Sequence, residues 1–226
     1  MTKNKLNIAV FATASLPIPP FKGYGGTQRG IYDFIRNMDE KGHRIHLFGP
    51  GDSDISKLEN TILHSYVENS LWTPENNLSI EKKSEESQRH YKESLEELTK
   101  IDKEEGIDIL NVRFDNVQII GKCKKLFGKN KIVYGLHNLT NQERIQAIQE
   151  LGVQCVAHCR NHRDQYNSLP NIKVITYGID VPAYPFSEET ITTTKETPKL
   201  EVLQKLKDRK EDYLINLGAI GKHKGQ

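Results

Sequence analysis

Short apolar runs alternate with amphipathic segments along most of the chain. Runs of about four to eight residues rich in β-branched and aromatic side chains are typical of buried strands. Such runs predict strands, in chain order, at 8–13, 44–48, 61–67, 107–112, 131–136, 153–157 and 172–176. Apolar residues at helical spacing predict helices, in chain order, between Thr27 and Gly42 and at 81–105, 117–127, 141–151 and 160–168.

The first of these helices has a clear apolar face. Its apolar residues stand at i, i+3, i+4 and i+7, namely Ile31, Phe34, Ile35 and Met38. Thr27 precedes them, and its side chain is of a type that caps helix starts. The pattern therefore predicts a helix that begins at Thr27 and packs one face on a core.

The segment 81–105 is dense in charge, because 15 of its 25 residues are Asp, Glu, Lys or Arg. Apolar side chains still recur in it at helical spacing, at Tyr91, Leu95, Leu98 and Ile101. This pattern is typical of a solvated surface helix that buries one stripe.

The order of the elements predicts the fold class. A strand, a glycine-rich loop, a helix and a second strand open the chain, as in a Rossmann-like βαβ unit. Strands that alternate with helices place helices on both faces of a sheet. We therefore expect an α/β fold, a Rossmann-like three-layer sandwich with a mostly parallel sheet.

The composition changes after Phe186. Residues 187–198 are rich in Thr, Glu and Lys, as a linker is, and a short amphipathic helix follows at 200–206. A new strand is expected at 213–217, followed by a Gly/Lys loop. The pattern predicts a linker and the start of a second domain.

Charge and composition exclude several classes of protein. The hydrophobic share of 36% suits a globular core, and 32 Lys and Arg against 30 Asp and Glu predict no nucleic-acid face. No apolar run approaches the roughly 20 residues that a membrane-spanning helix needs. Three scattered cysteines indicate a reducing cytoplasm and no disulfide framework.

The N-terminus loosely imitates a signal peptide. Lys3 and Lys5 precede the apolar residues 6–12, and small residues follow. The apolar stretch is short and is interrupted by Asn7. A buried first strand is therefore the favoured interpretation.

The loop after the first strand carries the sharpest chemical signal. Three prolines stiffen residues 14–20, and glycines that permit close backbone approach follow. Gly25 and Gly26 lie just before the predicted helix, and Arg29 lies in its first turn. Backbone N–H groups there could bind an anion, although a merely tight turn would use the same residues. The glycine spacing does not fit the dinucleotide fingerprint G-x-G-x-x-G.

Histidines and cysteines supply the other candidates. His137 follows a predicted strand, so it is either a functional group at the carboxyl edge or a hydrogen-bonded structural residue. Zinc-like spacing occurs at Cys155, His158, Cys159 and His162. The first lies in a predicted strand and the others turn into a helix, so their side chains should not converge. We therefore expect no metal.

Several motifs together resemble one enzyme family. They read, in chain order, Pro17-x-Pro19-Pro20-x-x-x-Tyr24-Gly25-Gly26-x-Gln28-Arg29, Gly42-His43, Leu47-Phe48-x-x-Gly51-Asp52-Ser53, Leu136-His137-Asn138, Tyr177-Gly178-Ile179-Asp180 and Leu217-Gly218-x-Ile220-x-x-x-Lys224-Gly225. This set resembles the family 4 glycosyltransferases of the GT-B fold, from their N-terminal half into the start of their C-terminal half.

The resemblance implies retaining transfer of a hexose from a nucleotide-sugar, usually a UDP-sugar, without a metal or another cofactor. It implies that Gly25 and Gly26, with Arg29 beside them, approach the donor diphosphate. It implies that His137 supports catalysis at the transferring sugar. Lys224 matches a lysine that contacts phosphate and offsets charge on the leaving diphosphate.

The resemblance also implies a domain plan and partners. An acceptor-side Rossmann-like domain would cover 1–186, a linker with a short helix 187–212, and an incomplete nucleotide-sugar domain 213–226. Gln28 replaces the usual Glu and Ala219 the usual Arg, and the family's E-x7-E region does not follow. The expected partners are a nucleotide-sugar, a sugar, lipid or small-molecule acceptor, and a second copy or a complementing C-terminal domain.

Two classes of function remain open at this point. The first is a hexosyltransferase that is incomplete as this chain. The second is a non-catalytic sugar- or nucleotide-binding module, or a partner subunit, derived from such an enzyme. A nicotinamide oxidoreductase is disfavoured, because the dinucleotide fingerprint is not present. Neither the donor sugar nor the acceptor can be read from the motifs.

Overall fold

In the computed structural model, the described residues are 5–21, 25–114, 116–136, 142–166, 169 and 172–175. All of them belong to one compact unit of the chain, Met1–Tyr177. The predicted linker at 187–212 and the strand at 213–217 lie outside the described residues.

Seven strands in the described part form one parallel sheet. The strands are β1 (Asn7–Phe11), β2 (Arg44–Phe48), β3 (Thr61–His64), β4 (Ile109–Val112), β5 (Ile132–Gly135), β6 (Gln154–Ala157) and β7 (Ile172–Val174). Their order across the sheet is β3-β2-β1-β4-β5-β6-β7. β1 thus lies inside the sheet, as its buried residues predict.

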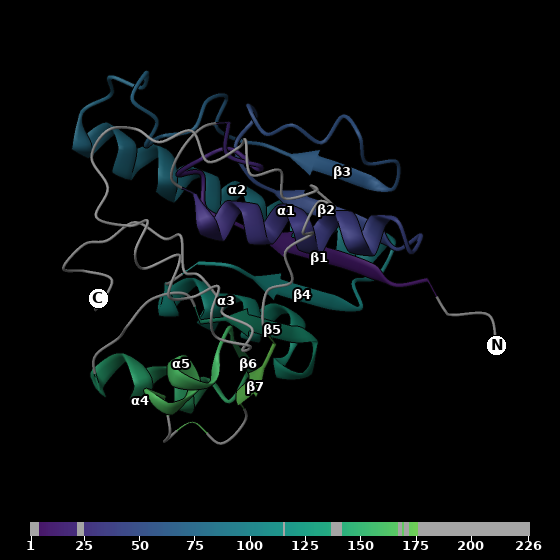
Figure 1. Cartoon of the computed structure of the whole chain (residues 1–226), viewed down its shortest axis with the longest axis vertical. Coiled ribbons are helices and arrows are strands. Elements are labelled where there is room, and N and C mark those ends of the chain that lie inside the picture. Colours follow the sequence, from purple (N-terminus) through teal and green to yellow (C-terminus); the bar gives the residue numbers. More distant parts are fainter. Residues whose placement is uncertain are drawn as a thin grey trace, which may run out of the picture. The chain divides into compact units, whose positions relative to one another are not determined.

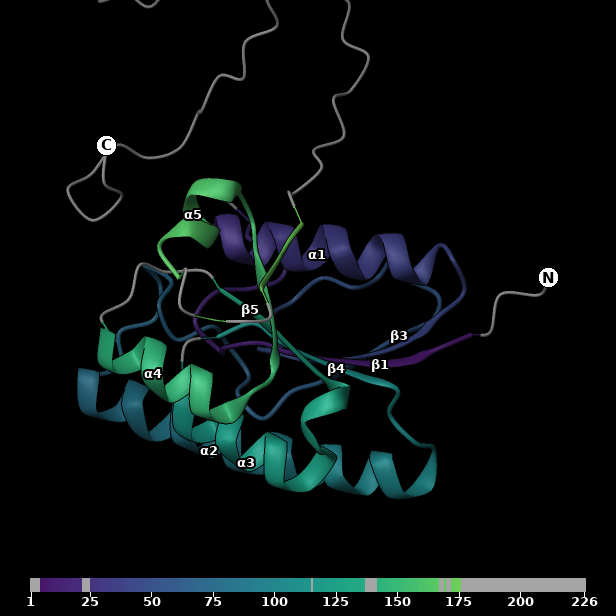
Figure 2. The same cartoon turned by 90° about the horizontal axis from the view of Figure 1, so that it is seen from below.

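Helices cover both faces of this sheet. They are α1 (Gly26–Asp39), α2 (Ile80–Glu104), α3 (Val117–Phe127), α4 (Gln142–Leu151) and α5 (Arg160–Asp164), and a 3-10 turn spans Lys129–Lys131. Figure 2 shows α1 and α5 on one face and α2, α3 and α4 on the other. The predicted α/β Rossmann-like sandwich is therefore confirmed.

The start of α1 differs from the prediction. The helix begins at Gly26, the capping position is Gly25, and Thr27 lies inside the first turn. The predicted cap by Thr27 is therefore wrong. The glycine ends the proline-rich loop in a conformation that other residues avoid, which fixes the helix start one residue earlier.

Six of the seven strands are shorter than predicted, and for β3 and β4 local hydrogen bonds give the reason. β4 begins at Ile109, because the Ile107 N–H donates to the Asp102 carboxylate at 2.8 Å and stays in the turn after α2. β3 ends at His64, where the chain bends and Ser65 Oγ donates to the Val67 carbonyl at 2.8 Å. Local hydrogen bonds of this kind do not show in an apolar pattern.

The charged helix α2 has the predicted form. Ser79 caps it by accepting from the Lys82 N–H at 3.2 Å, and Glu81 lies in its first turn, where the helix dipole favours acid. The predicted stripe is buried at Leu95, Leu98 and Ile101, while its other face carries ion pairs such as Lys82–Glu85 at 3.0 Å.

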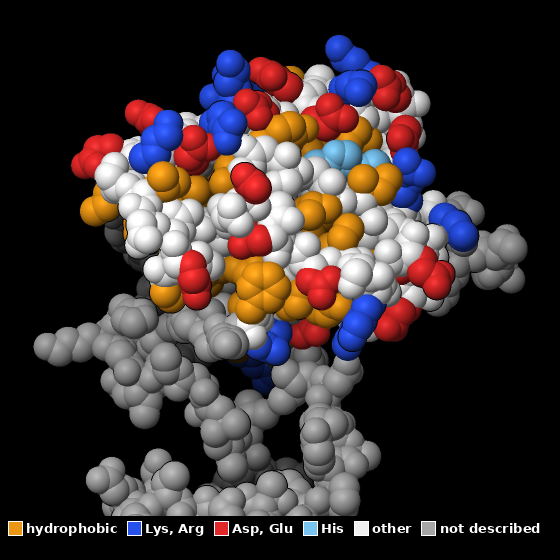
Figure 3. All heavy atoms as spheres, turned by 90° about the horizontal axis from the view of Figure 1, so that it is seen from above, with side chains coloured by type: hydrophobic (Ala, Val, Ile, Leu, Met, Phe, Trp, Pro, Cys, Tyr) orange, Lys and Arg blue, Asp and Glu red, His pale blue; other side chains and the backbone are white. Residues whose placement is uncertain are grey.

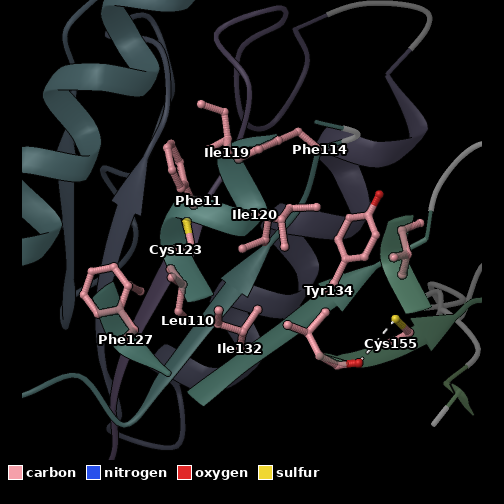
Figure 4. Close-up of a cluster of buried hydrophobic side chains, with 14 of the residues drawn as sticks. Phe11, Leu110, Phe114, Ile119, Ile120, Cys123, Phe127, Ile132, Tyr134 and Cys155 are labelled. Atoms are coloured by element: carbon pink, nitrogen blue, oxygen red, sulfur yellow. Dashed lines mark hydrogen bonds between the residues drawn. The ribbon is translucent and has the colours of Figure 1, made fainter. Parts of the chain in front are cut away.

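The core is divided by the sheet into two layers. Alternate residues of β1 face opposite sides, so Ile8 and Val10 pack under α1, while Ala9 and Phe11 pack on the other side. The larger layer joins β1, β4 and β5 to α3 (Figure 4), with Phe11 and Tyr134 among its largest side chains. This packing holds the carboxyl ends of β1 and β4 in fixed positions.

The outer surface is mixed in charge. Figure 3 shows acidic and basic side chains interspersed on one face, with small hydrophobic groups between them. Within the described residues, no helix is both long and apolar enough to cross a membrane.

Candidate functional site

The sheet has a topological switch point between β1 and β4. From β1 the chain builds outward to β2 and β3 on one side, and from β4 to β7 on the other (Figure 1). At such a point the loops after the two central strands diverge, and ligands of open α/β sheets bind in the crevice between them. Phe11 lies opposite Val112 in the register of β1 and β4. The loops after these two residues therefore bound the candidate site.

The predicted anion-binding residues gather at the start of α1. The Arg29 N–H donates to the Gly25 carbonyl at 2.9 Å, which closes the first helical turn. As in every α-helix, the N–H groups of the first turn have no acceptor inside the helix itself. Here no described side chain caps them either. The first turn holds no acidic residue, and Arg29 is exposed beside it. Amide groups, helix dipole and cation together favour an anion.

Gly25 occupies a position that other residues would strain. Its φ is 155°, and a Cβ added there would lie 2.7 Å from both Cβ and Cγ of Pro20. A Cβ at Gly26 would meet nothing within 4 Å. The close approach therefore belongs to Gly25 and the proline loop, and Gly26 leaves open space at the helix start.

A chain of polar side chains runs beside this helix start. Gln28, which is only 8% exposed, donates through Nε2 to Ser15 Oγ at 3.3 Å. Ser15 Oγ and Thr13 Oγ1 share a hydrogen bond of 2.6 Å. Gln28, the residue that departs from the family pattern, thus ties α1 to the loop after β1 without adding a charge.

Residues far away in the sequence anchor the same loop. Ser53 Oγ accepts from the Ile18 N–H at 3.1 Å. His90 of α2 is fully buried and donates through Nε2 to the Ala12 carbonyl at 3.1 Å. Burial lowers the pKa of His90, and the bond to Ala12 opposes this shift. His90 is therefore a neutral donor that fixes the carboxyl end of β1.

The segment 67–73 forms the opposite wall. Leu71 and Trp72 donate their backbone N–H groups to the carbonyls of Ala14 and Ser15, both at 2.9 Å. Asp52 holds this segment by accepting from the N–H of Ser70 at 3.0 Å and from its hydroxyl at 2.6 Å.

The backbone also approaches closely at this wall. A Cβ at Gly51 would lie 2.8 Å from the Glu68 carbonyl oxygen, so this approach requires glycine. The motif Gly51-Asp52-Ser53 thus positions both walls.

Two cavities lie beside the segment 67–73. One of about 750 Å³ lies along the loop after β1 and reaches the first turn of α1 at Thr27 and Gln28. The other, of about 970 Å³, lies between the segment 67–78 and the start of α2. Both are lined by Phe21, Thr73 and Glu75, so they are neighbours.

Arg113 brings a second cation to the switch point. It directly follows β4, and its N–H donates to the Phe11 carbonyl at 2.9 Å. Its side chain is largely buried, and the guanidinium carbon lies 5.4 Å from the centre of the Phe34 ring in α1. The sequence offered no spacing signal for Arg113, for His90 or for the anchoring by Ser53.

Two predicted site residues, His137 and Lys224, lie outside the described residues. The structure does bring Gly25, Gly26 and Arg29 together at one helix start. The lining of the smaller cavity includes their neighbours Thr27 and Gln28 in the same turn, and not these three residues themselves.

The zinc-like spacing can be followed only in part. Cys155 is buried in β6, its thiol donates to the Val153 carbonyl at 3.6 Å, and burial raises its pKa to about 12. Cys159 lies at the surface. In the part of the chain that the structure describes, no three His, Cys, Asp or Glu side chains cluster as metal ligands do.

The fold and site define an α/β domain with two cavities beside the loop that follows β1. No protein-family model matches the chain. No curated protein matches it either. Among solved structures, it is similar to a glycosyltransferase from Rickettsia africae ESF-5, with 16% identity, a TM-score of 0.49, and coverage of 91% of this chain and 50% of that chain. The chain thus spans about half the length of that structure.

Proposed function

We propose that this chain is the acceptor-side part of a retaining glycosyltransferase of family 4. It would transfer a hexose from a nucleotide-sugar, of the UDP-sugar class, to a sugar, lipid or small-molecule acceptor. The observation that carries the proposal is the uncapped start of α1 at the switch point, with Gly25, Gly26 and Arg29 together. Two of the motifs that resemble this family meet there, because Ser53 of Gly51-Asp52-Ser53 accepts from the Ile18 N–H of the proline loop.

The chemistry follows from charge. Cleaving the bond between a sugar and a diphosphate leaves negative charge on the diphosphate, and the catalyst gains most by stabilising that developing charge. The first-turn amides of α1 offer fixed donors, and Arg29 offers a cation, so this end of the helix suits the diphosphate. No metal or other cofactor is part of the proposal.

The other roles come from the resemblance. His137 would contact the transferring sugar, and Lys224 would offset charge on the leaving diphosphate. The domain boundaries at 186 and 212 belong to the same proposal, as does a complementing C-terminal domain or second copy.

Sugar transfer is the direct test. The chain, alone and mixed with a separately produced nucleotide-binding domain of a family 4 enzyme, is incubated with labelled UDP-glucose and UDP-galactose and a panel of acceptors. We expect labelled product with a retained anomeric configuration. Arg29→Ala should lower UDP affinity about tenfold, the loss of one charged contact, and Arg29→Lys should recover part of it. Arg29 is exposed, so these variants should fold normally.

The outcomes separate the two classes of function. UDP binding that depends on Arg29, with no transfer under any condition, would favour the non-catalytic binding module. A folded chain that binds no UDP or UDP-sugar even when mixed with the separately produced nucleotide-binding domain would contradict the proposal.

A further inference from the structure

The two neighbouring cavities offer a second binding surface beside the donor end. The smaller one reaches Thr27 and Gln28 in the first turn of α1, where we placed the diphosphate. A molecule in it would lie next to the sugar being transferred. With about 750 and 970 Å³, each cavity has the size of an ordinary small-molecule site.

Exposed aromatic rings form part of the lining. Phe21 is 65% exposed and lines both cavities, and Trp72 is 56% exposed and lines the smaller one. Lys83 Nζ lies 5.1 Å from the centre of the Trp72 ring, so a cation helps to hold this ring. Large aromatic side chains that remain in water beside a cavity mark a binding surface more often than isolated exposed residues do.

The wall that carries Trp72 is fixed before anything binds. Its backbone N–H donates to the Ser15 carbonyl, and the neighbouring Leu71 N–H donates to that of Ala14. Across the cavity, Ser53 holds Ile18 in the proline loop. A site that is already ordered loses little entropy when a ligand enters.

The polar groups around these rings are mostly neutral. Hydroxyl and amide side chains line the two cavities, among them Ser15, Gln28, Asn69, Thr73, Asn76 and Asn77. Such groups both donate and accept hydrogen bonds, as the hydroxyl groups of a sugar do. The C–H face of a sugar ring can pack on an aromatic ring while its hydroxyls reach polar groups at the rim.

The charged groups disfavour an anion. Glu75 lines both cavities, and exposed Glu68 lines the larger one. The cation among the residues that line the larger cavity is Arg89, which is already ion-paired with Glu86. Asp52 also lines the larger cavity, and it accepts the hydrogen bond of the Ser70 hydroxyl. The other nearby cation, Lys83, lies over the Trp72 ring, so carboxylates outnumber cations around these cavities and disfavour a phosphate or carboxylate.

From this arrangement we infer that the two cavities bind the acceptor, and that the acceptor presents an uncharged sugar ring stacked on Trp72 and Phe21. The role of the bound molecule as an acceptor rests on the proposed function, whereas the binding of an uncharged sugar does not.

Trp72 provides the readout, because it is the single tryptophan of the chain. The full chain is titrated with maltose, cellobiose, lactose and methyl glucosides, and with glucuronate and glucose 6-phosphate as charged probes. We expect a saturable blue shift of the emission with at least one neutral sugar, and at least tenfold weaker binding of both charged probes.

Variants locate the site. Phe21→Ala should weaken binding of the neutral sugar at least fivefold. Leu126→Ala, which changes a half-exposed apolar residue on α3, should leave it unchanged. The double variant Glu68→Lys with Glu75→Lys should reverse the preference toward glucose 6-phosphate. Circular dichroism of each variant checks that it is folded.

Three results would overturn the inference. They are charged probes that bind as tightly as neutral ones, a neutral sugar that binds equally well to Phe21→Ala, and the absence of any response to the whole panel. UDP binding, measured separately by calorimetry, tests the proposed function. Sugar binding without UDP binding would leave this site standing and remove only its role as an acceptor site.

Discussion

At the residue scale, Gly25 links the proline loop to α1. Its φ of 155° lies where side chains are rarely tolerated, and Pro20 fills the space a Cβ would need. The neighbouring Gly26 has neither constraint. Two adjacent glycines of one motif therefore have different reasons to be glycine: the first is demanded by the backbone and by packing, and the second leaves room at the helix start.

Gly25→Ala should lower the free energy of unfolding by about 1–3 kcal/mol, because the variant strains the backbone and collides with Pro20. Gly26→Ala is the matched control and should change it by less than about 0.5 kcal/mol. Urea unfolding followed by circular dichroism measures both. Equal effects of the two variants would contradict the assignment of strain to Gly25.

A pair of histidines makes stability depend on pH. His46 Nδ1 and His64 Nε2 lie 3.0 Å apart and share one proton, and their rings stack. The pKa of each is lowered, chiefly by burial. For His46 the positive charge of His64 adds to this, and the Glu105 carboxylate, 3.8 Å from His46 Nε2, opposes it.

Because the folded state holds these histidines neutral, the unfolded state takes up more protons below their ordinary pKa of 6.5. The free energy of unfolding should therefore be constant above neutral pH and fall as the pH drops below about 6.5. His90, with its own lowered pKa, adds to the slope. Urea unfolding at several pH values between 5 and 8 measures it, and His64→Gln should make the slope shallower. A slope that His64→Gln leaves unchanged would show that this pair does not cause it.

At the element scale, the end of α1 is tied to the start of β3 by one carboxylate. Asp39 accepts from the N–H groups of Glu59 and Asn60 at 3.1 and 2.8 Å and from Thr61 Oγ1 at 2.7 Å. A negative charge at a helix C-terminus is normally unfavourable. Burial raises the pKa of Asp39, but the bonds from Thr61, Asn60 and Glu59 together lower it below its ordinary value.

Asp39→Ala should therefore lower the free energy of unfolding by about 1.5–3 kcal/mol, since it leaves these donors without their acceptor. Asp54→Ala is the control, because Asp54 is exposed and bonds only locally, to Ser56. It should cost less than about 0.5 kcal/mol. Thermal or urea unfolding measures the stability of both variants. A similar loss of unfolding free energy in both would count against the role of Asp39.

The loop after β1 shows why the candidate site could be predicted only in part. Gly25, Gly26 and Arg29 were predicted from a local pattern, because a glycine-rich segment directly before a helix can be recognised in the sequence. The anchors were not predicted, because they join distant residues: Ile18 and Ser53 are 35 positions apart, and Ala12 and His90 are 78. No local pattern reports which buried histidine will meet which carbonyl.

At the scale of the whole molecule, the parallel sheet sets a gradient of protection. β1 lies between β2 and β4 and is buried along nearly its whole length. β7 has three residues, none fully buried, and pairs only with β6 among the described strands. The strands that frame the switch point are therefore the best packed in the sheet.

Native-state hydrogen exchange should follow this gradient. Amides of β1 and β4 should exchange only by global unfolding, while those of β7 should exchange by local opening and much faster. Mass spectrometry of peptic peptides at increasing denaturant measures the two classes. Equal protection of β1 and β7 would contradict the sheet order.

The sequence by itself determined the α/β class, the parallel sheet and nearly all of the described elements, and it led to the hypothesis for three residues of the candidate site. It could do so because hydrophobic period, turn residues and helix starts are local properties of a chain. Only the tertiary structure decided the strand order, the place of the switch point, the anchors of the proline loop and the cavities beside it. Each of these depends on contacts between segments that are distant in the chain, and such contacts follow from packing the whole sheet and not from any single stretch of it.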